Sequence, residues 1–441
     1  MSSEIKNQAE ILSKLGIEAL NAMQLEAQET INSGANVVLL SPTGTGKTLA
    51  FLLPLIQKLD PEIEHVQALI LAPSRELALQ IEQVLKDMGT GLKTNAVYGG
   101  RPMTQDRLDL KQAPAILIGT PGRVADHLRK GSVLPDYISH LILDEFDKSL
   151  EIGFESEMRE IIETLQDVKQ RILTSATQEI DVPDFVKLSE PKVLNYLNQG
   201  IQKLEVKIID SEFKDKLPAL VMLLKHLGPQ PGIVFCNFKE SINRVSEYLL
   251  EHGISHGIFY GGMEQKDRER ALIKFRNGTH NILLATDLAA RGLDVPEMKF
   301  IIHYHLPLKS QEFTHRNGRT ARMHSDGTAY VLAYRKENLP DFIEKLNAET
   351  IDSATLVPST EEAAKEWCTL FISGGRRDKI SKGDIAGMFF KQGKLKNEQL
   401  GVIELKPDCA FVSVEKKGVN QLIKLVDNAR LKSKKVRITR V

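Results

Sequence analysis

The chain has 441 residues, of which 42% are hydrophobic and 26% are charged, and its formal net charge is zero. At roughly 150 residues per domain, this length predicts about three domains, each large enough to bury a core. No apolar stretch approaches the roughly 18 residues that span a bilayer, and residues 1–8 lack the apolar segment of a secretory signal, so we expect a cytoplasmic protein without membrane contact.

The cysteines indicate neither disulfide bonds nor a metal site. Cys236, Cys368 and Cys409 are widely separated, and none has a histidine or cysteine neighbour at the spacing of metal ligands. A disulfide framework and a structural zinc site are therefore not expected. The three side chains are interpreted as small buried groups.

Short β-rich runs alternate with helical periodicity from residue 36 to about residue 193. Segments such as Arg75–Met88 have apolar residues at helical spacing. This alternation is typical of a parallel sheet covered by helices on both faces. The predicted strands are Val37–Leu40, Ala68–Leu71, Ala115–Ile118, Leu141–Leu143 and Ile172–Thr174.

A glycine-rich turn follows the first predicted strand and leads into a predicted helix. The run is Ser41-Pro-Thr-Gly-Thr-Gly-Lys-Thr48. Glycines let backbone N–H groups approach phosphates, Lys47 can reach the β and γ oxygens, and Thr48 can ligate Mg²⁺. A plain strand–helix turn would not require the Lys-Thr pair. The run therefore predicts a nucleotide and Mg²⁺ site that includes Thr43, Gly44, Thr45, Gly46, Lys47 and Thr48.

Two acidic residues follow the apolar run Leu141–Leu143, where a parallel sheet places its ligand crevice. Asp144 can hold Mg²⁺ through water, and Glu145 can orient and deprotonate an attacking water. A lone acidic pair is usually solvated surface. Because this pair comes after a phosphate-binding loop, we interpret it as the hydrolytic part of the same site.

The strand–helix rhythm restarts after residue 202, with a helix predicted over Lys239–His252. Tyr98-Gly-Gly100 and Tyr260-Gly-Gly262 form a weak internal echo, which suggests that the two halves share one plan. We therefore expect a second parallel-sheet domain. Its predicted strands are Ile233–Cys236, Ile282–Ala285, Phe300–Tyr304 and Thr328–Leu332.

A basic run, His315-Arg-Asn-Gly-Arg-Thr-Ala-Arg322, lies in this second half. Arg316, Arg319 and Arg322 recur every three residues, so they can share one helical face. Judged alone, the run is equally well a solvated stripe. Together with the phosphate loop, it predicts arginine fingers that reach the γ-phosphate from the other domain, worth about 10³ to 10⁵ in rate. Hydrolysis would then require the two domains to close.

Residues 347–366 are polar and lack a strong period, which predicts a linker. The following segment has the order strand, helix, strand, strand, helix, strand, which matches the small split-βαβ sheet of RNA-recognition domains. Residues 368–441 contain 17 Lys or Arg against 7 Asp or Glu, an excess that suggests a polyanion partner. The predicted elements are Thr369–Ser373, Gly383–Phe390, Gly401–Leu405, Ala410–Val414, Val419–Asn428 and Lys435–Thr439.

Two features of this segment are candidates for RNA contact. Phe371 and Phe411 lie on strands predicted to be neighbours and can offer a stacking surface, or both can pack in the core or under a helix. The basic residues Arg376, Arg377, Lys379 and Lys382 cluster in the first loop, and others crowd the end of the chain. Such a cluster is often only a solvated face, but the charge excess favours phosphate binding. About six phosphate contacts would weaken RNA binding about 10³-fold between about 50 and 200 mM salt.

Residues 16–322 resemble the helicase core of the DEAD-box ATP-dependent RNA helicases, with Asp144-Glu-Phe-Asp147 in place of the family's tetrapeptide. The C-terminal segment is similar to the RNA-binding domain of the DbpA-type members, chiefly in Leu370-Phe-Ile-Ser-Gly-Gly-Arg-Arg377 and Lys382-Gly-Asp-Ile-Ala-Gly387. Together the two resemblances span nearly the whole chain. The other signatures follow in family order: Gln24 of the Q motif, Pro73-Ser-Arg-Glu-Leu77, Gly99-Gly100, Thr120-Pro-Gly-Arg123, Ser175-Ala-Thr177, Gln265-Lys-Asp-Arg268 and Thr286-Asp-Leu-Ala-Ala-Arg-Gly-Leu-Asp294.

The resemblance implies two tandem RecA-like α/β domains, over residues 1–200 and 201–346, a linker over residues 347–366 and an RRM-like α+β domain over residues 367–441. It implies that Gln24 reads the adenine of ATP and that Asp294 contacts the ribose. Ser175 and Thr177 would link Asp144 and Glu145 to His315, which would act with Arg319 and Arg322. The implied RNA path, which uses mainly phosphate and sugar contacts, consists of Pro73, Arg75, Gly100, Thr120, Arg123, Gln265, Arg268 and Thr286.

The implied function is an RNA-stimulated ATPase that separates short duplexes, with ATP and Mg²⁺ as its cofactors. The small domain implies that the RNA is a hairpin of large-subunit ribosomal RNA, bound during ribosome assembly. An ATP-gated RNA clamp or assembly scaffold would use the same residues, and a DNA translocase of the wider superfamily is a more distant alternative. The sequence identifies no protein partner.

Overall fold

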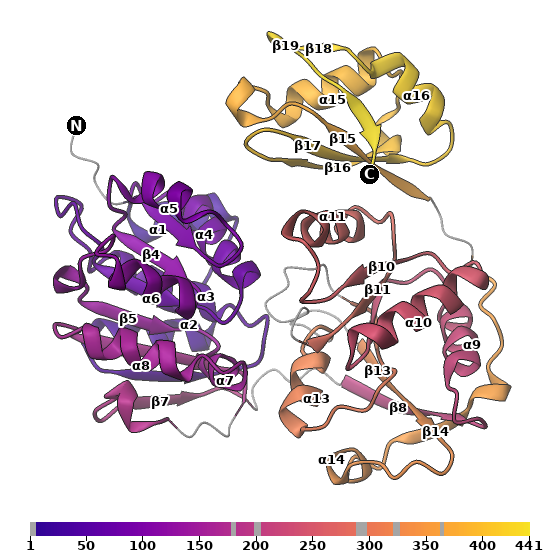
Figure 1. The fold of residues 1–441 in the computed structure, drawn as a ribbon, viewed down its shortest axis with the longest axis horizontal. Coiled ribbons are helices and arrows are strands. Elements are labelled where there is room, and N and C mark those ends of the chain that lie inside the picture. Colours follow the sequence, from indigo (N-terminus) through magenta and orange to yellow (C-terminus); the bar gives the residue numbers. More distant parts are fainter. Residues whose placement is uncertain (1–5, 178–181, 198–203, 288–297, 321–326, 362–365) are drawn as a thin grey trace. The chain divides into compact units, whose positions relative to one another are not determined.

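The structure is a computed structural model that describes residues 6–177, 182–197, 204–287, 298–320, 327–361 and 366–441. The chain forms two compact units, one built mainly from residues 1–202 and the other mainly from residues 203–441. The predicted fold class is confirmed, because the units contain two seven-stranded parallel sheets and a four-stranded antiparallel sheet (Figure 1). No helix in the described part of the chain has the length and apolarity that a membrane span requires.

The sheet of the first unit has the strand order β3-β4-β2-β5-β6-β1-β7, and all of its neighbouring strands run parallel. Strand β1 lies near one edge and is followed by the glycine-rich turn, with β6 beside it toward the centre and β5 beside β6. The strands are β1 (Val37–Leu40), β2 (Ala68–Leu71), β3 (Thr94–Val97), β4 (Ile116–Gly119), β5 (His140–Leu143), β6 (Gln170–Ser175) and β7 (Lys192–Asn195).

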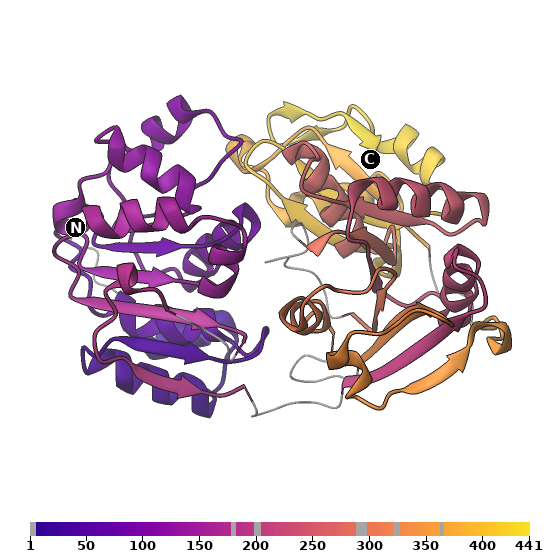
Figure 2. The same cartoon turned by 60° about the horizontal axis from the view of Figure 1, so that its bottom comes forward.

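Helices cover both faces of this sheet. Val37 and Leu39 point into a core shared with α1 to α4, whereas Val38 and Leu40 point into a second core shared with α6 to α8. Figure 2 shows the indigo helices from the start of the chain on one face and the magenta helix α8 on the other. The helices are α1 (Gln8–Leu15), α2 (Ala22–Asn32), α3 (Lys47–Ile56), α4 (Arg75–Met88), α5 (Met103–Leu110), α6 (Pro121–Arg129), α7 (Phe146–Glu151) and α8 (Glu155–Thr164).

The second unit repeats this plan. Its parallel sheet has the order β10-β11-β9-β12-β13-β8-β14, so each strand occupies the same place as its counterpart in the first sheet. The predicted common plan of the two halves is confirmed. The strands are β8 (Leu204–Ser211), β9 (Gly232–Phe235), β10 (His256–Phe259), β11 (Ile282–Ala285), β12 (Phe300–His303), β13 (Gly327–Tyr334) and β14 (Glu349–Asp352). Its described helices are α9 (Leu217–Leu227), α10 (Lys239–Glu251), α11 (Gln265–Arg276), α13 (Ser310–Asn317) and α14 (Asp341–Glu344).

The expectation of a linker over residues 347–366 is wrong for its first part. Strand β14 pairs in parallel with β8, and a short 3-10 turn at Ser353–Thr355 follows it. Because β14 is an edge strand with Glu349 and Thr350 exposed, its sequence is polar and resembles a loop. The second sheet therefore continues past residue 346.

The small domain within the second unit has the predicted βαββαβ order. Its sheet runs β16-β17-β15-β20 and packs one face against α15 and α16, through residues such as Ile372, Val412 and Phe389. The predicted last strand, Lys435–Thr439, is divided between a two-stranded ribbon and β20. The elements are β15 (Trp367–Ile372), α15 (Lys382–Lys391), β16 (Leu400–Leu405), β17 (Ala410–Glu415), α16 (Val419–Val426), β18 (Arg430–Leu431), β19 (Lys434–Lys435) and β20 (Ile438–Arg440).

Candidate functional site

The glycine-rich turn between β1 and α3 forms a loop that suits phosphate binding. Gly44 and Gly46 have φ angles of 85° and 88°, in the left-handed region that favours glycine. The hydroxyls of Ser41 and Thr45 lie 2.7 Å apart across the loop. Helix α3 begins directly at Lys47, so its N-terminal N–H groups face the loop, as the sequence predicted.

Lys47 lies inside this loop. Its Nζ donates to the carbonyl oxygen of Pro42 at 2.8 Å and also to that of Ser41. Burial lowers the pKa of Lys47 to about 8, although the nearby carboxylates of Glu145 and Asp144 raise it. The ammonium group can exchange its carbonyl partners for phosphate oxygens.

Gln24 lies against the same loop. It forms a capping box with Asn21 at the start of α2, and its Nε2 donates to the carbonyl oxygen of Gly46 at 3.3 Å. A Cβ added at Gly46 would lie 2.5 Å from that Nε2, so a larger residue there would displace the end of the Gln24 side chain. Asn21, which we did not predict, donates from Nδ2 to the carbonyl oxygen of Thr45 at 3.1 Å. Its signal in the sequence is the Asn-x-x-Gln capping box.

The acidic pair follows β5 and is strongly constrained. Glu145 has φ 48° and ψ 50°, a left-handed conformation that is unusual for a residue other than glycine and typical of functional sites. The hydroxyl of Thr174 accepts from the N–H of Glu145 at 3.1 Å and donates to the carboxylate of Asp144. Burial, followed by the neighbouring Glu145, raises the pKa of Asp144 to about 6. Two carboxylates are thus held side by side, in a setting that favours a bound cation.

The hydroxyl that contacts Asp144 belongs to a residue that the sequence did not single out. The hydroxyl of Thr174 donates to the carboxylate of Asp144. The hydroxyl of Thr177 donates to Asp147 at 3.1 Å, and the N–H of Thr177 donates to the hydroxyl of Ser175 at 3.0 Å. Sequence reasoning singled out Ser175 and Thr177 because they occur in a family motif. Thr174 is the polar residue that ends the apolar run of β6, and this position is its only signal.

A second residue that sequence reasoning missed is Lys148. Its side chain is fully buried, and its Nζ lies 2.9 Å from Oε2 of Glu145. A buried charge requires a partner of opposite charge, and Lys148 and Glu145 supply it to each other. In the sequence, the only sign of this contact is that Lys148 follows Glu145 by three residues at the start of a short helix.

The expectation that Arg316, Arg319 and Arg322 share a helical face is wrong. Helix α13 ends at Asn317, so Arg319 lies beyond its end, while Arg322 lies outside the described residues, as does Asp294. His315 lies on α13, as expected.

Arg316 has a structural role. Its side chain is 1% exposed, and it forms two hydrogen bonds of 2.6 Å with the carboxylate of Asp287. It also donates to Asn237 Oδ1 at 2.9 Å and to the carbonyl oxygen of His305 at 2.8 Å. Arg316 therefore fixes α13 to the carboxyl ends of β9, β11 and β12.

His303, beside Arg316, makes the second unit sensitive to acid. Burial, and then the nearby Arg316, lower the pKa of His303 to about 3, and its Nε2 lies 2.9 Å from Asn317 Oδ1. In the unfolded chain the pKa is about 6.5, so below that pH the unfolded state binds a proton that the folded state excludes. We expect the unit to lose about 2 kcal/mol of stability between pH 7 and pH 5 through this group. Urea unfolding at both pH values tests this, because His303→Gln should remove that part of the loss. An unchanged pH dependence in the variant would contradict it.

Residues of the implied RNA path meet within each unit. In the first unit the guanidinium of Arg75 lies so close to Gly100 that a Cβ there would be 2.5 Å from Nη1. In the second unit Arg268 lies over the ring of Phe259 at 4.7 Å, and the N–H of Thr286 donates to the carbonyl oxygen of Phe259. Pro73 is buried before α4, and Gln265 begins α11.

Arg123 is held by an internal ion pair. Its Nε donates to the buried carboxylate of Asp106 at 2.7 Å, and its Nη2 donates to the carbonyl oxygen of Arg101 at 2.6 Å. Thr120 precedes the first residue of α6, Pro121. These contacts fix the start of α6, where backbone N–H groups can meet a phosphate.

The small domain presents a basic loop. Arg376, Arg377, Lys379 and Lys382 are exposed, while Lys434 nearby pairs with Asp378 at 2.8 Å. The loop is anchored because the N–H groups of Arg376 and Arg377 donate to the carbonyls of Lys406 and Pro407. These side chains are available to phosphates.

The two candidate stacking residues of the small domain are direct neighbours. Phe371 lies opposite Phe411 in the sheet, and their rings meet edge to face at 5.6 Å between centroids. Phe411 is only 5% exposed, whereas Phe371 is half-buried. The face is therefore largely covered, which leaves little aromatic surface for a base.

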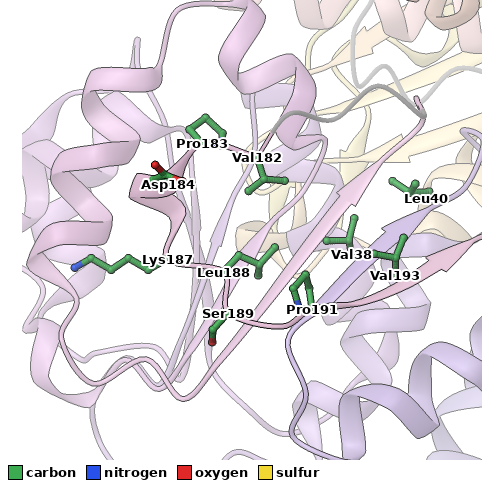
Figure 3. Close-up of a pocket in the computed structure, with 10 residues that line it drawn as sticks. All are labelled: Val38, Leu40, Val182, Pro183, Asp184, Lys187, Leu188, Ser189, Pro191 and Val193. Carbon is green, nitrogen blue, oxygen red and sulfur yellow. The ribbon is translucent and has the colours of Figure 1, made fainter.

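A pocket of about 620 Å³ lies at the β1–β7 edge of the first sheet (Figure 3). Val38, Leu40 and Val193 line it from the strands, and Pro183 and Leu188 line it from the segment before β7. None of its lining residues belongs to the predicted nucleotide or RNA sites. Its lining is mainly apolar, so it does not suit a phosphate.

Comparisons with known proteins agree with this geometry. Models of three families match the chain: "DEAD/DEAH box helicase" at residues 21–185, "Helicase conserved C-terminal domain" at residues 215–324 and "DbpA RNA binding domain" at residues 369–440. The ATP-dependent RNA helicase DbpA of Escherichia coli (strain K12) is 32% identical over 439 residues, which covers 97% of this chain and 95% of that protein. The protein of the same name from Bacillus subtilis (strain 168) is 30% identical over 439 residues, covering 92% and 91%.

Solved structures share the fold of the core. S. cerevisiae Dbp5 bound to RNA and ADP BeF3 matches with a TM-score of 0.68 at 24% identity, over 80% of this chain and 96% of that chain. The DEAD-box helicase Mss116 bound to ssRNA and UDP-BeF also matches with a TM-score of 0.68, at 26% identity, over 82% of this chain and 79% of that chain.

Proposed function

We propose, from the premise that this chain belongs to the DbpA-type DEAD-box ATP-dependent RNA helicases, that its substrate is large-subunit ribosomal RNA. The enzyme separates short duplexes of this RNA in the cytoplasm during ribosome assembly. The observation that carries the proposal is the small domain, which matches the DbpA RNA binding domain over residues 369–440 and exposes four basic side chains in one loop. RNA binding and ATP hydrolysis are activities of the whole family, whereas the ribosomal target is what we infer for this chain.

The residues of the glycine-rich phosphate loop fit a nucleoside triphosphate with Mg²⁺. Gly44 and Gly46 leave room for phosphates, and Lys47 is a buried cation beside two carboxylates. The raised pKa of Asp144 indicates a carboxyl group that gains from a cation partner. Thr48 and Asp144 would hold the ion, Thr43 and Thr45 would complete the cradle, and Gln24 and Asp294 would bind the nucleoside. When bound, the ion offsets charge on the transferred phosphoryl group.

The chain's own residues carry out the remaining steps. Glu145 accepts a proton from the attacking water, and the Thr174 hydroxyl holds its backbone in place. Lys47 stabilises charge on the phosphates from the first unit. Arg319 and Arg322, both within residues 201–346, add positive charge at the phosphates, and His315 couples RNA to the nucleotide through Ser175 and Thr177. This division assigns residues 1–200 to binding the phosphates, residues 201–346 to supplying the arginines and residues 367–441 to recognising the ribosomal RNA.

We expect deletion of Cys368–Val441 to preserve RNA-stimulated ATP hydrolysis while removing the preference for ribosomal RNA over generic RNA. The groups of the phosphate loop and the acidic pair all lie outside the deleted segment, whereas the exposed basic loop lies within it. Phosphate release measured with ribosomal RNA and with a random RNA of equal length tests the expectation. A truncated protein that discriminated as well as the whole chain would refute the proposed target.

A strand-displacement assay serves as the control for unwinding. A helicase of this kind separates a short tailed duplex in the presence of ATP, whereas an ATP-gated clamp holds the RNA and leaves the duplex paired. The same assay with a DNA duplex of identical sequence tests the third alternative. A DNA translocase would separate that duplex, whereas an RNA helicase would leave it paired.

A further inference from the structure

Helix α5 of the first unit buries the charged side chain of Asp106 completely. Asp106 is 0% exposed, whereas Arg107 on the same helix is exposed and Asp109 has 34% of its side chain exposed. A buried carboxylate is costly unless it is paired, so its partners indicate what it does for the structure. These partners lie in two segments, the turn after β3 and the first turns of α6, and both segments contain residues of the implied RNA path.

Asp106 is connected to the turn after β3 through Arg101. Nη1 of Arg101 lies 3.3 Å from Oδ1 of Asp106, and its Nη2 donates to the carboxylate of Asp109. Arg101 directly follows Gly100, whose φ of 89° favours glycine and against which the guanidinium of Arg75 lies. The two carboxylates of α5 therefore hold the residue that ends this turn.

The same carboxylate is connected to α6 through Arg123 and His127. Arg123 donates from Nε to Oδ2 of Asp106 at 2.7 Å, and Nε2 of the fully buried His127 lies 3.3 Å from that oxygen. Arg123 also donates from Nη2 to the carbonyl oxygen of Arg101 at 2.6 Å. Because β3 and β4 are neighbours in the sheet, the segments that follow them lie side by side, and Asp106 joins the two.

These contacts fix the direction of the Arg123 guanidinium. A guanidinium group carries five N–H donors in one plane, so two contacts from different nitrogens determine where the remaining donors point. In Arg123 these two contacts are the carboxylate of Asp106 at Nε and the carbonyl of Arg101 at Nη2. The Arg123 side chain is 11% exposed, which suits a group that is oriented from within and meets a ligand at one edge.

We propose that Asp106 is a positioning residue for RNA. Through Arg101 and Arg123 it holds the turn after β3 and the start of α6 in one arrangement, in which both segments meet phosphates of the bound strand. Asp106 itself does not touch RNA, because its side chain is fully buried. The inference rests on the proposed function, since it takes both segments as parts of an RNA path.

Asp106→Asn in the full chain is the direct test, because charge and positioning predict opposite results. Removal of a negative charge would by itself tighten RNA binding, whereas loss of positioning weakens it. We expect the RNA concentration that gives half-maximal ATP hydrolysis to rise about 10-fold, the effect of one lost charge-assisted hydrogen bond. The rate at saturating RNA and the KM for ATP should not change. A half-maximal RNA concentration that stays the same or falls would overturn the proposal.

A uridine homopolymer serves as the RNA, so that a preference for ribosomal RNA has no bearing on the result. Asp126→Asn is the matched control, because it makes the same chemical change on α6, where Asp126 pairs with the exposed Arg129 at 2.9 Å. Its half-maximal RNA concentration should stay within about 2-fold of that of the unchanged protein. If RNA did not stimulate even the unchanged protein, the proposed function would fail together with this inference. A stimulated protein with an unaffected Asp106→Asn variant would defeat only the inference.

A double-mutant cycle shows whether Asp106 acts through Arg123. In a chain that already carries Arg123→Gln, the further change Asp106→Asn should alter the half-maximal RNA concentration by less than about 2-fold, because the group that it orients is gone. Fully additive effects of the two substitutions would overturn this route.

Arg101→Lys tests the other connection, and it decides the matter even if Asp106→Asn unfolds the first unit. Lysine keeps the positive charge at a side chain that is 26% exposed, but it cannot contact Asp106 and Asp109 with one planar group. A direct phosphate contact would survive this change, whereas the positioning of the turn would not. We expect the half-maximal RNA concentration to rise about 3-fold. An unchanged value would overturn the proposal, which requires both connections.

Discussion

RNA-stimulated ATP hydrolysis is expected to fall about 10³-fold when Glu145 is replaced by glutamine, because a general base contributes about 10² to 10⁴ in rate. The amide has nearly the shape of the carboxylate, so it keeps the loop and the hydrogen bond from the Glu145 N–H to Thr174. It cannot accept the proton of the attacking water. Nucleotide binding should therefore be retained while turnover is lost.

Single-turnover phosphate release with saturating RNA is the direct measurement, with nucleotide affinity measured separately. Glu155→Gln provides a matched control, because Glu155 lies on the neighbouring helix α8 with 55% of its side chain exposed and pairs with Arg159. Its rate should equal that of the unchanged protein. A Glu145→Gln variant with normal turnover would remove the general base from the mechanism.

The central strands of both large sheets were predictable from the sequence, whereas the edge strands were not. A strand buried on both faces is a continuous apolar run, as Val37–Leu40 is, and no other feature is needed to recognise it. The strands that sequence reasoning missed in the first sheet, β3 and β7, are its two edges. In the second sheet both edges, β10 and β14, were missed, together with β8 beside one of them. The edge strands β3, β7 and β14 carry polar residues that resemble loops, whereas β10 is largely buried and is only a short run.

The local part of the candidate site was predictable for a similar reason. The phosphate loop is a contiguous run whose glycines and Lys47 have a direct physical purpose, and α3 begins where this pattern places it. Thr174 and Lys148 contact the acidic pair only because β6 lies beside β5 and because α7 folds back on Glu145. No pattern in the sequence gives that adjacency.

The arginine run shows how a periodicity can mislead. Spacing of three residues predicted a shared helical face, but α13 ends at Asn317, and its buried arginine serves the fold. Arg316 and Asp287 connect the helix to the ends of three strands, so they position the chain that continues toward Arg319. The helix thus aligns the following residues and does not itself present all three guanidinium groups.

Replacing Arg316 by methionine is expected to destabilise the second unit by about 3 to 5 kcal/mol, because it leaves the Asp287 carboxylate without its partner in a mostly buried setting. Arg316→Lys keeps the charge but loses the two-pronged contact, so its loss should be intermediate. Arg335→Met is a matched control: Arg335 also contacts two carboxylates, at 2.7 and 2.8 Å, but half of its side chain is exposed, and its loss should be much smaller. Urea unfolding of the whole chain, followed through the transition of the second unit, measures all three. Equal losses for Arg316→Met and Arg335→Met would show that burial does not increase what the ion pair of Arg316 with Asp287 contributes to the free energy of unfolding. Arg316 would then have no special part in positioning α13.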